Sequence, residues 1–179
     1  MKENESQYDL IADRYDNLFN DELSLAENAE VGEMLLPLIG SVLDIGCGTG
    51  LLTEIVSITP ENYYGIDPSE KMLFKFKSKH PQYNHLICAA YDGSVVKCDD
   101  YDNIIALFGA ASYLDDRALK ELAKANKKKF LMFYKENYHP LTYEKCGVEF
   151  HHYIRSKGKL SSMFTKNVVE EFDNYLIVK

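Results

Sequence analysis

The chain has 179 residues, of which 46% are hydrophobic and 27% charged, and its formal net charge is −8. This composition predicts one globular domain with a buried core, and the acidic balance argues against binding DNA by neutralising its phosphates. No apolar run is long enough to span a membrane, and residues 1–6 lack the basic and apolar regions of a signal peptide. We therefore expect a cytoplasmic protein whose four cysteines, which lack metal-ligand spacing, remain free thiols.

The N-terminal segment places apolar residues at helical spacing. Tyr8, Ile11 and Tyr15 recur every three or four residues, which predicts an amphipathic helix that packs on the domain. A second helix is expected from Leu23 to Leu36, because the proline that follows cannot continue it.

Residues 42–50, which read VLDIGCGTG, join a short apolar run to a glycine-rich loop. Alternating glycines let the backbone adopt positive φ and let a ligand lie against it without meeting a Cβ atom. Leu51 then begins a helix that is expected to end at Ile58, and the amides at its start would face the ligand. A tight strand-to-helix turn without a ligand is the alternative.

The details of this loop distinguish two classes of ligand. A dinucleotide-binding loop has its third glycine at the sixth position, where this chain has Leu51. Asp44 stands where the chain leaves the strand, and its negative charge would oppose a pyrophosphate nearby. A cationic ligand suits this loop better.

The second strand is expected at Tyr63–Asp67, with an acid at its carboxyl end. In a doubly wound sheet that end faces the ligand, and the Asp67 carboxylate can accept hydrogen bonds from both hydroxyls of a ribose. A helix N-cap is the alternative role for Asp67. A helix then begins near Pro68, and a third strand follows at His85–Cys88. The stretch from there to Asp100 is too short for a full crossover helix.

The next elements follow from one apolar block and its neighbours. Five consecutive nonpolar residues, Ile104 to Phe108, predict a central parallel strand that is buried on both faces, and Gly109 then lets the chain turn. A helix capped by Asp115-Asp116 and a fifth strand at Phe130–Tyr134 are expected next. The lysine run 127–129 lies between them, where cations complement a helix C-terminus.

The C-terminal part carries the least pattern. Residues 137–154 show no sustained period, and a short helix is expected to end within 160–164. Residues 168–172 and 175–178 predict an antiparallel hairpin, with one longer helix through Glu171 and a single last strand as the alternative. We expect the three histidines of this region to lie at exposed loop positions: His139, His151 and His152.

Segments 42–50, 63–73 and 101–114 resemble motifs of the class I S-adenosylmethionine-dependent methyltransferases that act on small molecules, the type 11/25 group. The resemblance implies a doubly wound α/β fold with a mostly parallel seven-stranded sheet and a C-terminal antiparallel hairpin. It also implies a single methyltransferase domain over 1–179, made of an N-terminal lid and helices (1–37), a cofactor-binding core (42–134), a substrate-side segment (137–165) and a terminal hairpin (166–179).

The same resemblance implies a set of residues that bind S-adenosylmethionine. The pattern Tyr-Asp-x-Ile-Ala-x-x-Tyr-Asp at 8–16 resembles the lid of these enzymes, although plain core packing is the alternative. For Met72 the alternative to cofactor binding is core packing, and for Asp92 the alternative is a role in a simple turn. The implied cofactor-binding residues are Tyr8, Tyr15, Asp44, Gly46, Cys47, Gly48, Gly50, Asp67, Pro68, Met72, Tyr91, Asp92, Leu107 and Phe108.

The resemblance implies transfer of a methyl group to an oxygen or nitrogen of a small acceptor. Nucleic-acid amino-methylating enzymes carry an Asp/Asn-Pro-Pro-aromatic signature in the fourth motif, and 101–114 lacks it. A general base is required only for an acceptor that arrives protonated with a high pKa, and the weak candidates are Tyr113 and His152. No metal is expected. The alternatives are a noncatalytic cofactor-binding or interaction module, a protein or RNA methyltransferase, and a nicotinamide-dependent oxidoreductase.

Overall fold

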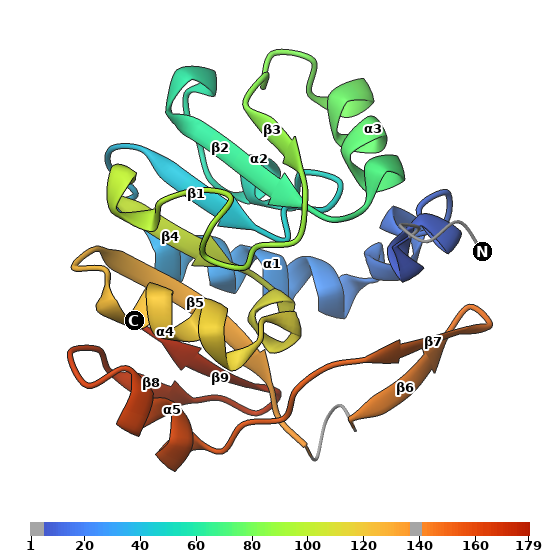
Figure 1. The fold of residues 1–179 in the computed structure, drawn as a ribbon. Coiled ribbons are helices and arrows are strands. Elements are labelled where there is room, and N and C mark those ends of the chain that lie inside the picture. The colour runs from blue at the N-terminus through green and yellow to red at the C-terminus, as the bar shows by residue number, and fades with distance from the viewer. Residues whose placement is uncertain (1–5, 137–140) are drawn as a thin grey trace.

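One sheet of seven strands forms the centre of the protein, for which this computed structural model describes residues 6–136 and 141–179 (Figure 1). The first five strands pair in parallel, whereas β9 runs antiparallel to β5 and to β8. The order is β3–β2–β1–β4–β5–β9–β8, in which the strands are β1 (Val42–Ile45), β2 (Tyr63–Asp67), β3 (Leu86–Cys88), β4 (Asn103–Ala106), β5 (Lys128–Tyr134), β8 (Val169–Glu171) and β9 (Tyr175–Val178). The predicted fold and terminal hairpin are therefore confirmed, and the alternative of one longer last helix is wrong.

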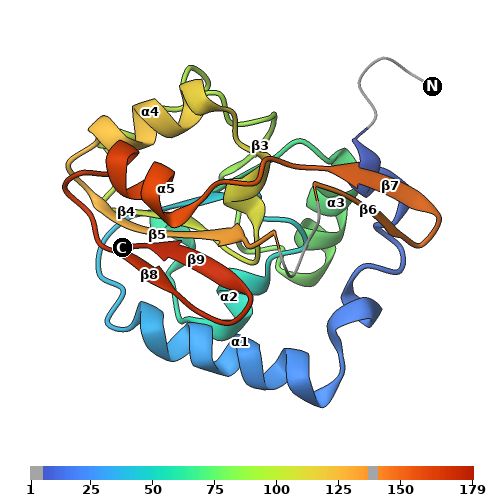
Figure 2. The same cartoon turned by 90° about the horizontal axis from the view of Figure 1, so that it is seen from below.

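Helices cover both faces of this sheet (Figure 2). The helices α1 (Glu22–Leu35), α2 (Leu51–Ile55) and α3 (Glu70–Lys79) lie on one face, and α4 (Asp116–Lys124) and α5 (Lys157–Met163) lie on the other. No helix within residues 6–136 or 141–179 is long and apolar enough to cross a membrane.

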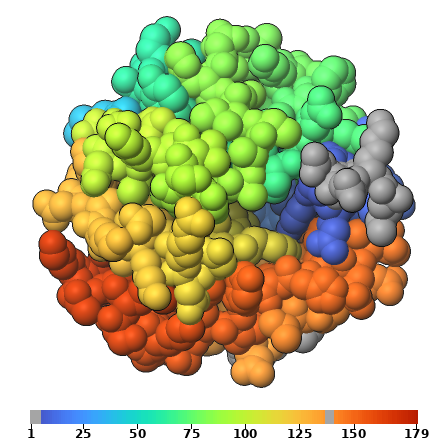
Figure 3. Space-filling view, viewed as in Figure 1, coloured from blue at the N-terminus to red at the C-terminus, as the bar shows by residue number. Residues whose placement is uncertain are grey.

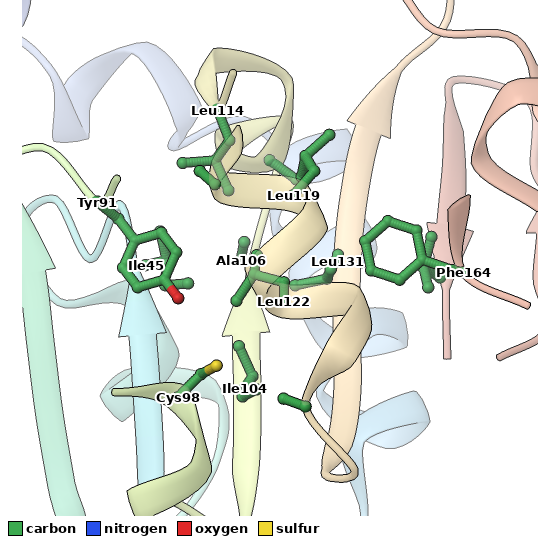
Figure 4. Packing of buried hydrophobic residues seen from close by; sticks show 14 of the residues in the cluster. Ile45, Tyr91, Cys98, Ile104, Ala106, Leu114, Leu119, Leu122, Leu131 and Phe164 are labelled. Atoms are coloured by element: carbon green, nitrogen blue, oxygen red, sulfur yellow. The ribbon is translucent and has the colours of Figure 1, made fainter. Parts of the chain in front are cut away.

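The burial of both faces explains why the central strands read as continuous apolar runs. On the α4 face, Leu119 and Leu122 pack over Ala106 and Leu131, and all of these side chains are fully buried (Figure 4). On the opposite face, Phe76 of α3 contributes to a second buried cluster. Large apolar side chains on both sides make β4 and β5 the rigid base for the loops that follow them.

The polar ends of α4 match the prediction in part. Asp115 alone caps the helix, accepting a hydrogen bond from the Ala118 amide at 2.7 Å, whereas Asp116 is the first helical residue. At the other end, Lys129 Nζ donates to the Ala125 carbonyl at 2.6 Å. The lysine run therefore supplies a cation to the helix C-terminus, as predicted.

The helix after the glycine loop and the fourth strand are shorter than predicted. The helix α2 ends at Ile55 rather than Ile58, because Val56 is already extended with φ −133°. The strand β4 ends at Ala106, because Phe108 has φ +44° and Gly109 has φ +81°, which turn the chain. Between β3 and β4 the described chain forms only the short 3₁₀ helix η4 (Cys98–Asp100), which agrees with the predicted absence of a full crossover helix.

The N-terminal segment differs in form from the predicted amphipathic α-helix. It folds as two short 3₁₀ helices, η1 (Gln7–Leu10) and η2 (Asp16–Phe19), joined by turns. Helical spacing of the apolar residues does not distinguish the two helix types when each helix spans about one turn. We call residues 6–19 the lid.

The region after β5 contains a hairpin that the sequence analysis missed. Strands β6 (Thr142–Lys145) and β7 (Val148–His151) pair across a tight turn in which Cys146 and Gly147 both have positive φ. We call this hairpin the arm, and Figure 1 shows it beside the lid. His139 lies outside the described residues, so its expected exposed loop position stays a prediction.

Candidate functional site

A cavity lies where the direction of the chain through the sheet reverses. From β1 the chain proceeds outward to β2 and β3, and it then returns to the other side of β1 as β4. The carboxyl ends of β1 and β4 therefore leave a crevice between the loops that follow them, which is where doubly wound folds bind ligands. The cavity measures about 970 Å³ and is lined by both of these loops, by α1, by the lid and by the arm.

The glycine loop forms the floor of this cavity, and its three glycines have different surroundings. All three have positive φ, at +74° for Gly46, +52° for Gly48 and +102° for Gly50. A Cβ atom on Gly46 would lie 2.8 Å from Ala110, and one on Gly50 would lie 2.9 Å from the His80 ring. A Cβ atom on Gly48 would meet no protein atom within 4 Å, so this glycine leaves open space beside the cavity.

Two buried carboxylates lie near the carboxyl ends of β1 and β2, the strands that border the loop. Asp44 is 2% exposed and accepts a hydrogen bond from the Tyr63 hydroxyl at 2.7 Å. Asp67 accepts hydrogen bonds from the amides of Gly48 at 2.9 Å and Ser69 at 2.8 Å. Burial raises the pKa of Asp44 to about 7 and the pKa of Asp67 to about 6. A cation in the cavity would stabilise the ionised form of both groups.

The lid is attached to the core at the start of α3 and at the glycine loop. Asp9 accepts hydrogen bonds from the Ser69 hydroxyl at 2.5 Å and the Lys71 amide at 2.9 Å, both at the start of α3. Asp16 accepts a hydrogen bond from the Thr49 hydroxyl at 2.5 Å, inside the glycine loop itself. These contacts hold the lid over the cavity, with Tyr8 and Tyr15 among its lining residues.

Tyrosine hydroxyls join the lid to the arm. Tyr8 donates to the hydroxyl of Tyr113 at 3.0 Å, and Tyr113 shares a second hydrogen bond of 2.7 Å with Tyr143 of β6. Phe150 of β7 is fully buried, with its ring 4.9 Å from the Tyr8 ring. The arm and the lid consequently cover the cavity together, and Figure 3 shows them in contact on this face of the molecule.

The structure places most of the predicted cofactor residues on the cavity wall, and it separates three other predicted residues from that wall. Gly50 faces α3, as its close approach to His80 shows. The Asp92 carboxylate accepts hydrogen bonds from the amide and hydroxyl of Ser94 at 2.8 and 2.7 Å, which is the turn given as its alternative. His152 lies behind the wall, with its ring 5.2 Å from the Tyr134 ring, and it is buried, so the exposed position expected for it is wrong. The predicted residues that line the cavity are Tyr8, Tyr15, Asp44, Gly46, Cys47, Gly48, Asp67, Pro68, Met72, Tyr91, Leu107, Phe108 and Tyr113.

Other lining residues were missed by the sequence analysis. Tyr134 ends β5 and Tyr175 begins β9, and an antiparallel strand begins at the edge where its parallel neighbours end. Their positions at the two ends of predicted strands were a usable signal. Glu27 of α1 and Lys145 of the arm carried no such signal, because only the tertiary structure brings α1 and the arm to the cavity.

The chain also resembles known proteins in sequence. A family model described as a methyltransferase domain matches residues 42–129. An archaeal protein, "Uncharacterized protein MJ1252" of Methanocaldococcus jannaschii, is 30% identical over 123 residues. The match covers 67% of this chain and 46% of that protein, so the chain spans about half the length of this curated relative.

Solved structures share the fold over nearly the whole chain. The CcbJ methyltransferase of Streptomyces caelestis superposes with a TM-score of 0.70 at 15% identity, covering 98% of this chain and 97% of that one. A Thermotoga maritima protein described as "SAM-dependent methyltransferase, possible histamine N-methyltransferase (TM1293)" has a TM-score of 0.66 at 20% identity, with 97% and 90% covered. The solved structures show the fold, and the family model identifies residues 42–129 as a methyltransferase domain, which agrees with the predicted class I S-adenosylmethionine-dependent methyltransferase of the type 11/25 group.

Proposed function

We propose that this chain transfers the methyl group of S-adenosylmethionine to an oxygen or nitrogen atom of a small acceptor. The observation that carries the proposal is the cavity of about 970 Å³ in which two buried carboxylates and the glycine loop adjoin an aromatic wall. This volume lies at the upper end of the roughly 300–1,000 Å³ range of small-molecule sites, which gives room for a cofactor and a second molecule.

The residues at the glycine-loop end fit the proposed cofactor. The open space at Gly48 admits a ligand close to the backbone, and the Asp67 carboxylate can accept hydrogen bonds from ribose hydroxyls. Asp44 would face the ammonium group, while Pro68 and Met72 would line the adenosine. When bound, S-adenosylmethionine supplies a methyl group on a sulfonium, which is already an activated leaving group.

The residues of the chain then need to align the acceptor and exclude water rather than to provide strong acid–base catalysis. Burial and the hydrogen bond with Tyr143 raise the pKa of Tyr113, so its hydroxyl keeps its proton at neutral pH. Tyr113 consequently serves as a hydrogen-bonding wall residue that joins the lid to the arm. His152 contributes by packing behind that wall.

The cover formed by the lid and the arm supports a small acceptor. The contacts of Asp9 and Asp16 with the core, and of Tyr8 with Tyr113, close the cavity over the glycine loop. A folded protein or an RNA helix would need this cover to be displaced, whereas a metabolite fits beneath it.

Calorimetry and a methyl-transfer screen test the proposal. We expect S-adenosylmethionine and its demethylated product to bind the purified protein, and Asp67→Ala to lower both affinities at least ~10-fold, about 1.4 kcal/mol. Asp99→Ala is the matched control, because Asp99 is exposed and lies outside the cavity lining. If neither ligand binds the wild-type protein, the proposal fails.

The labelled-methyl screen covers metabolites, peptides and RNA, and it separates the remaining alternatives. A metabolite acceptor supports the proposal. Cofactor binding without any acceptor would indicate a noncatalytic module, and a peptide or RNA acceptor would indicate a macromolecular substrate.

A further inference from the structure

The end of the cavity beyond the glycine loop is a built aromatic wall. The Tyr175 ring lies 5.8 Å from the Tyr134 ring and 6.3 Å from the Phe108 ring, and all three residues line the cavity. Phe108 holds φ +44°, which is rare for an aromatic residue, and such backbone strain concentrates at functional sites. Gly109 leaves the Tyr134 ring room against the backbone, because a Cβ atom there would overlap the ring.

A carboxylate lies beside this wall. Glu27 of α1 lines the same cavity and forms a side-chain hydrogen bond with Asn174, the residue immediately before Tyr175. Partial burial raises the pKa of the Glu27 carboxyl above its ordinary value. This hydrogen bond holds the acid at the start of β9, in the cavity that the three rings line.

The other carboxylates that line the described cavity have different tasks. Asp16 and Glu54 both pair with Lys79, at 3.0 and 2.9 Å. Asp44 and Asp67 belong to the proposed cofactor end. Lys145, the other lining lysine, lies over the Phe19 ring at 3.8 Å on the lid side. Glu27 thus remains as the acid available to a second ligand.

We propose that the acceptor is a small primary or secondary amine, held by the Glu27 carboxylate and by the faces of the Phe108, Tyr134 and Tyr175 rings. This inference rests on the proposed methyl transfer. An ammonium group forms a charge-assisted hydrogen bond with a carboxylate and is attracted to aromatic faces. An alcohol of the same shape would leave the partly buried carboxylate without a cationic partner.

The transfer balances with Glu27 as the proton acceptor. The bound ammonium gives one proton to the carboxylate, and the nitrogen lone pair then forms the bond to the methyl carbon. The carbon–sulfur bond breaks and its electron pair stays on sulfur, which leaves a neutral thioether and an N-methylated ammonium. The proton on Glu27 returns to solvent, and the raised pKa of Glu27 makes it a stronger base than an exposed glutamate.

Calorimetry on the protein saturated with the demethylated cofactor tests the inference. The probes are benzylamine and cyclohexylamine, each compared with the alcohol and the carboxylate of the same ring skeleton. We expect each amine to bind at least ~10-fold more tightly than its partners and to accept labelled methyl groups. Glu27→Gln should remove at least ~10-fold of the amine affinity, whereas Glu30→Gln, on an exposed position of the same helix, should not.

The affinity for the demethylated cofactor distinguishes failure of this inference from failure of the proposed methyl transfer. If the cofactor product binds but alcohols or carboxylates bind as well as the amines, the inference is overturned while the methyl-transfer proposal stands. Unchanged amine affinity in Glu27→Gln overturns it too. If the cofactor product does not bind the wild-type protein at all, the proposed function fails and the inference falls with it.

Discussion

Alanine substitutions at Gly48 and Gly50 should separate ligand binding from folding within one loop. Both glycines have positive φ, so both substitutions strain the backbone. Their surroundings differ, because a Cβ atom on Gly48 would stand in open space beside the cavity. A Cβ atom on Gly50 would lie 2.9 Å from the His80 ring and 3.1 Å from the Phe76 ring.

The expected magnitudes follow from these surroundings. Gly48→Ala should cost about 1 kcal/mol of the free energy of unfolding, from the left-handed backbone alone, and lower Tm by about 2–4 °C. It should also weaken cofactor binding at least ~10-fold, because the methyl group takes the space of the ligand. Gly50→Ala adds a steric clash with a fully buried phenylalanine, for a total of about 3 kcal/mol and about 6–12 °C.

Thermal unfolding without ligand and calorimetry with S-adenosylmethionine measure the two effects separately. The Gly48 variant should be more stable than the Gly50 variant. When each affinity is corrected for the fraction of folded protein, the Gly48 variant should bind the cofactor more weakly. Full cofactor affinity in Gly48→Ala would refute our assignment of this space to the ligand. A Gly50 variant as stable as the Gly48 variant would refute the packing contrast.

Three further perturbations address the lid, the wall and the buried acids. Asp9→Ala removes the group that accepts a hydrogen bond from the Ser69 hydroxyl, so it should raise the rate of hydrogen exchange in the lid and the Kd for the cofactor. Asp13→Ala removes only an exposed ion pair and should change neither quantity. Tyr113→Phe should lower kcat by less than ~10-fold, since its loss is about 1 kcal/mol of hydrogen bonding, and a loss of ~1,000-fold would instead indicate a base. Burial raises the pKa of Asp44 to about 7 and the pKa of Asp67 to about 6, and a bound cation favours the ionised form of both groups. Cofactor binding near pH 6.5 should therefore release protons, and the cofactor affinity should rise as the pH increases through 6 and 7. Equal binding enthalpies in buffers of different ionisation enthalpy would contradict this last expectation.

The sequence alone determined the features that depend on neighbouring residues. The glycine loop and the start of its helix, the position of Asp67 at a strand end, and the buried strand before Gly109 all follow from local rules of backbone geometry and apolar patterning. Those rules failed where a helix or strand was too short to show a repeating pattern of apolar residues. The arm is the main case, although a glycine at position 147, which adopts positive φ in the turn, is a residue type that signals a hairpin.

Only the tertiary structure decided which of these residues meet. Tyr8, Tyr113 and Tyr143 come from the lid, from the loop after β4 and from the arm, and their hydroxyls bond although the first two are 105 positions apart. Asp92 is the opposite case, because its carboxylate accepts a hydrogen bond from the amide of Ser94, only two residues away. Local chemistry therefore predicted most of the cavity-lining residues that we propose to bind the methyl donor. The wall that we propose to bind the acceptor is assembled from separate elements, whose contacts depend on how the sheet and helices pack rather than on the spacing of residues along the chain.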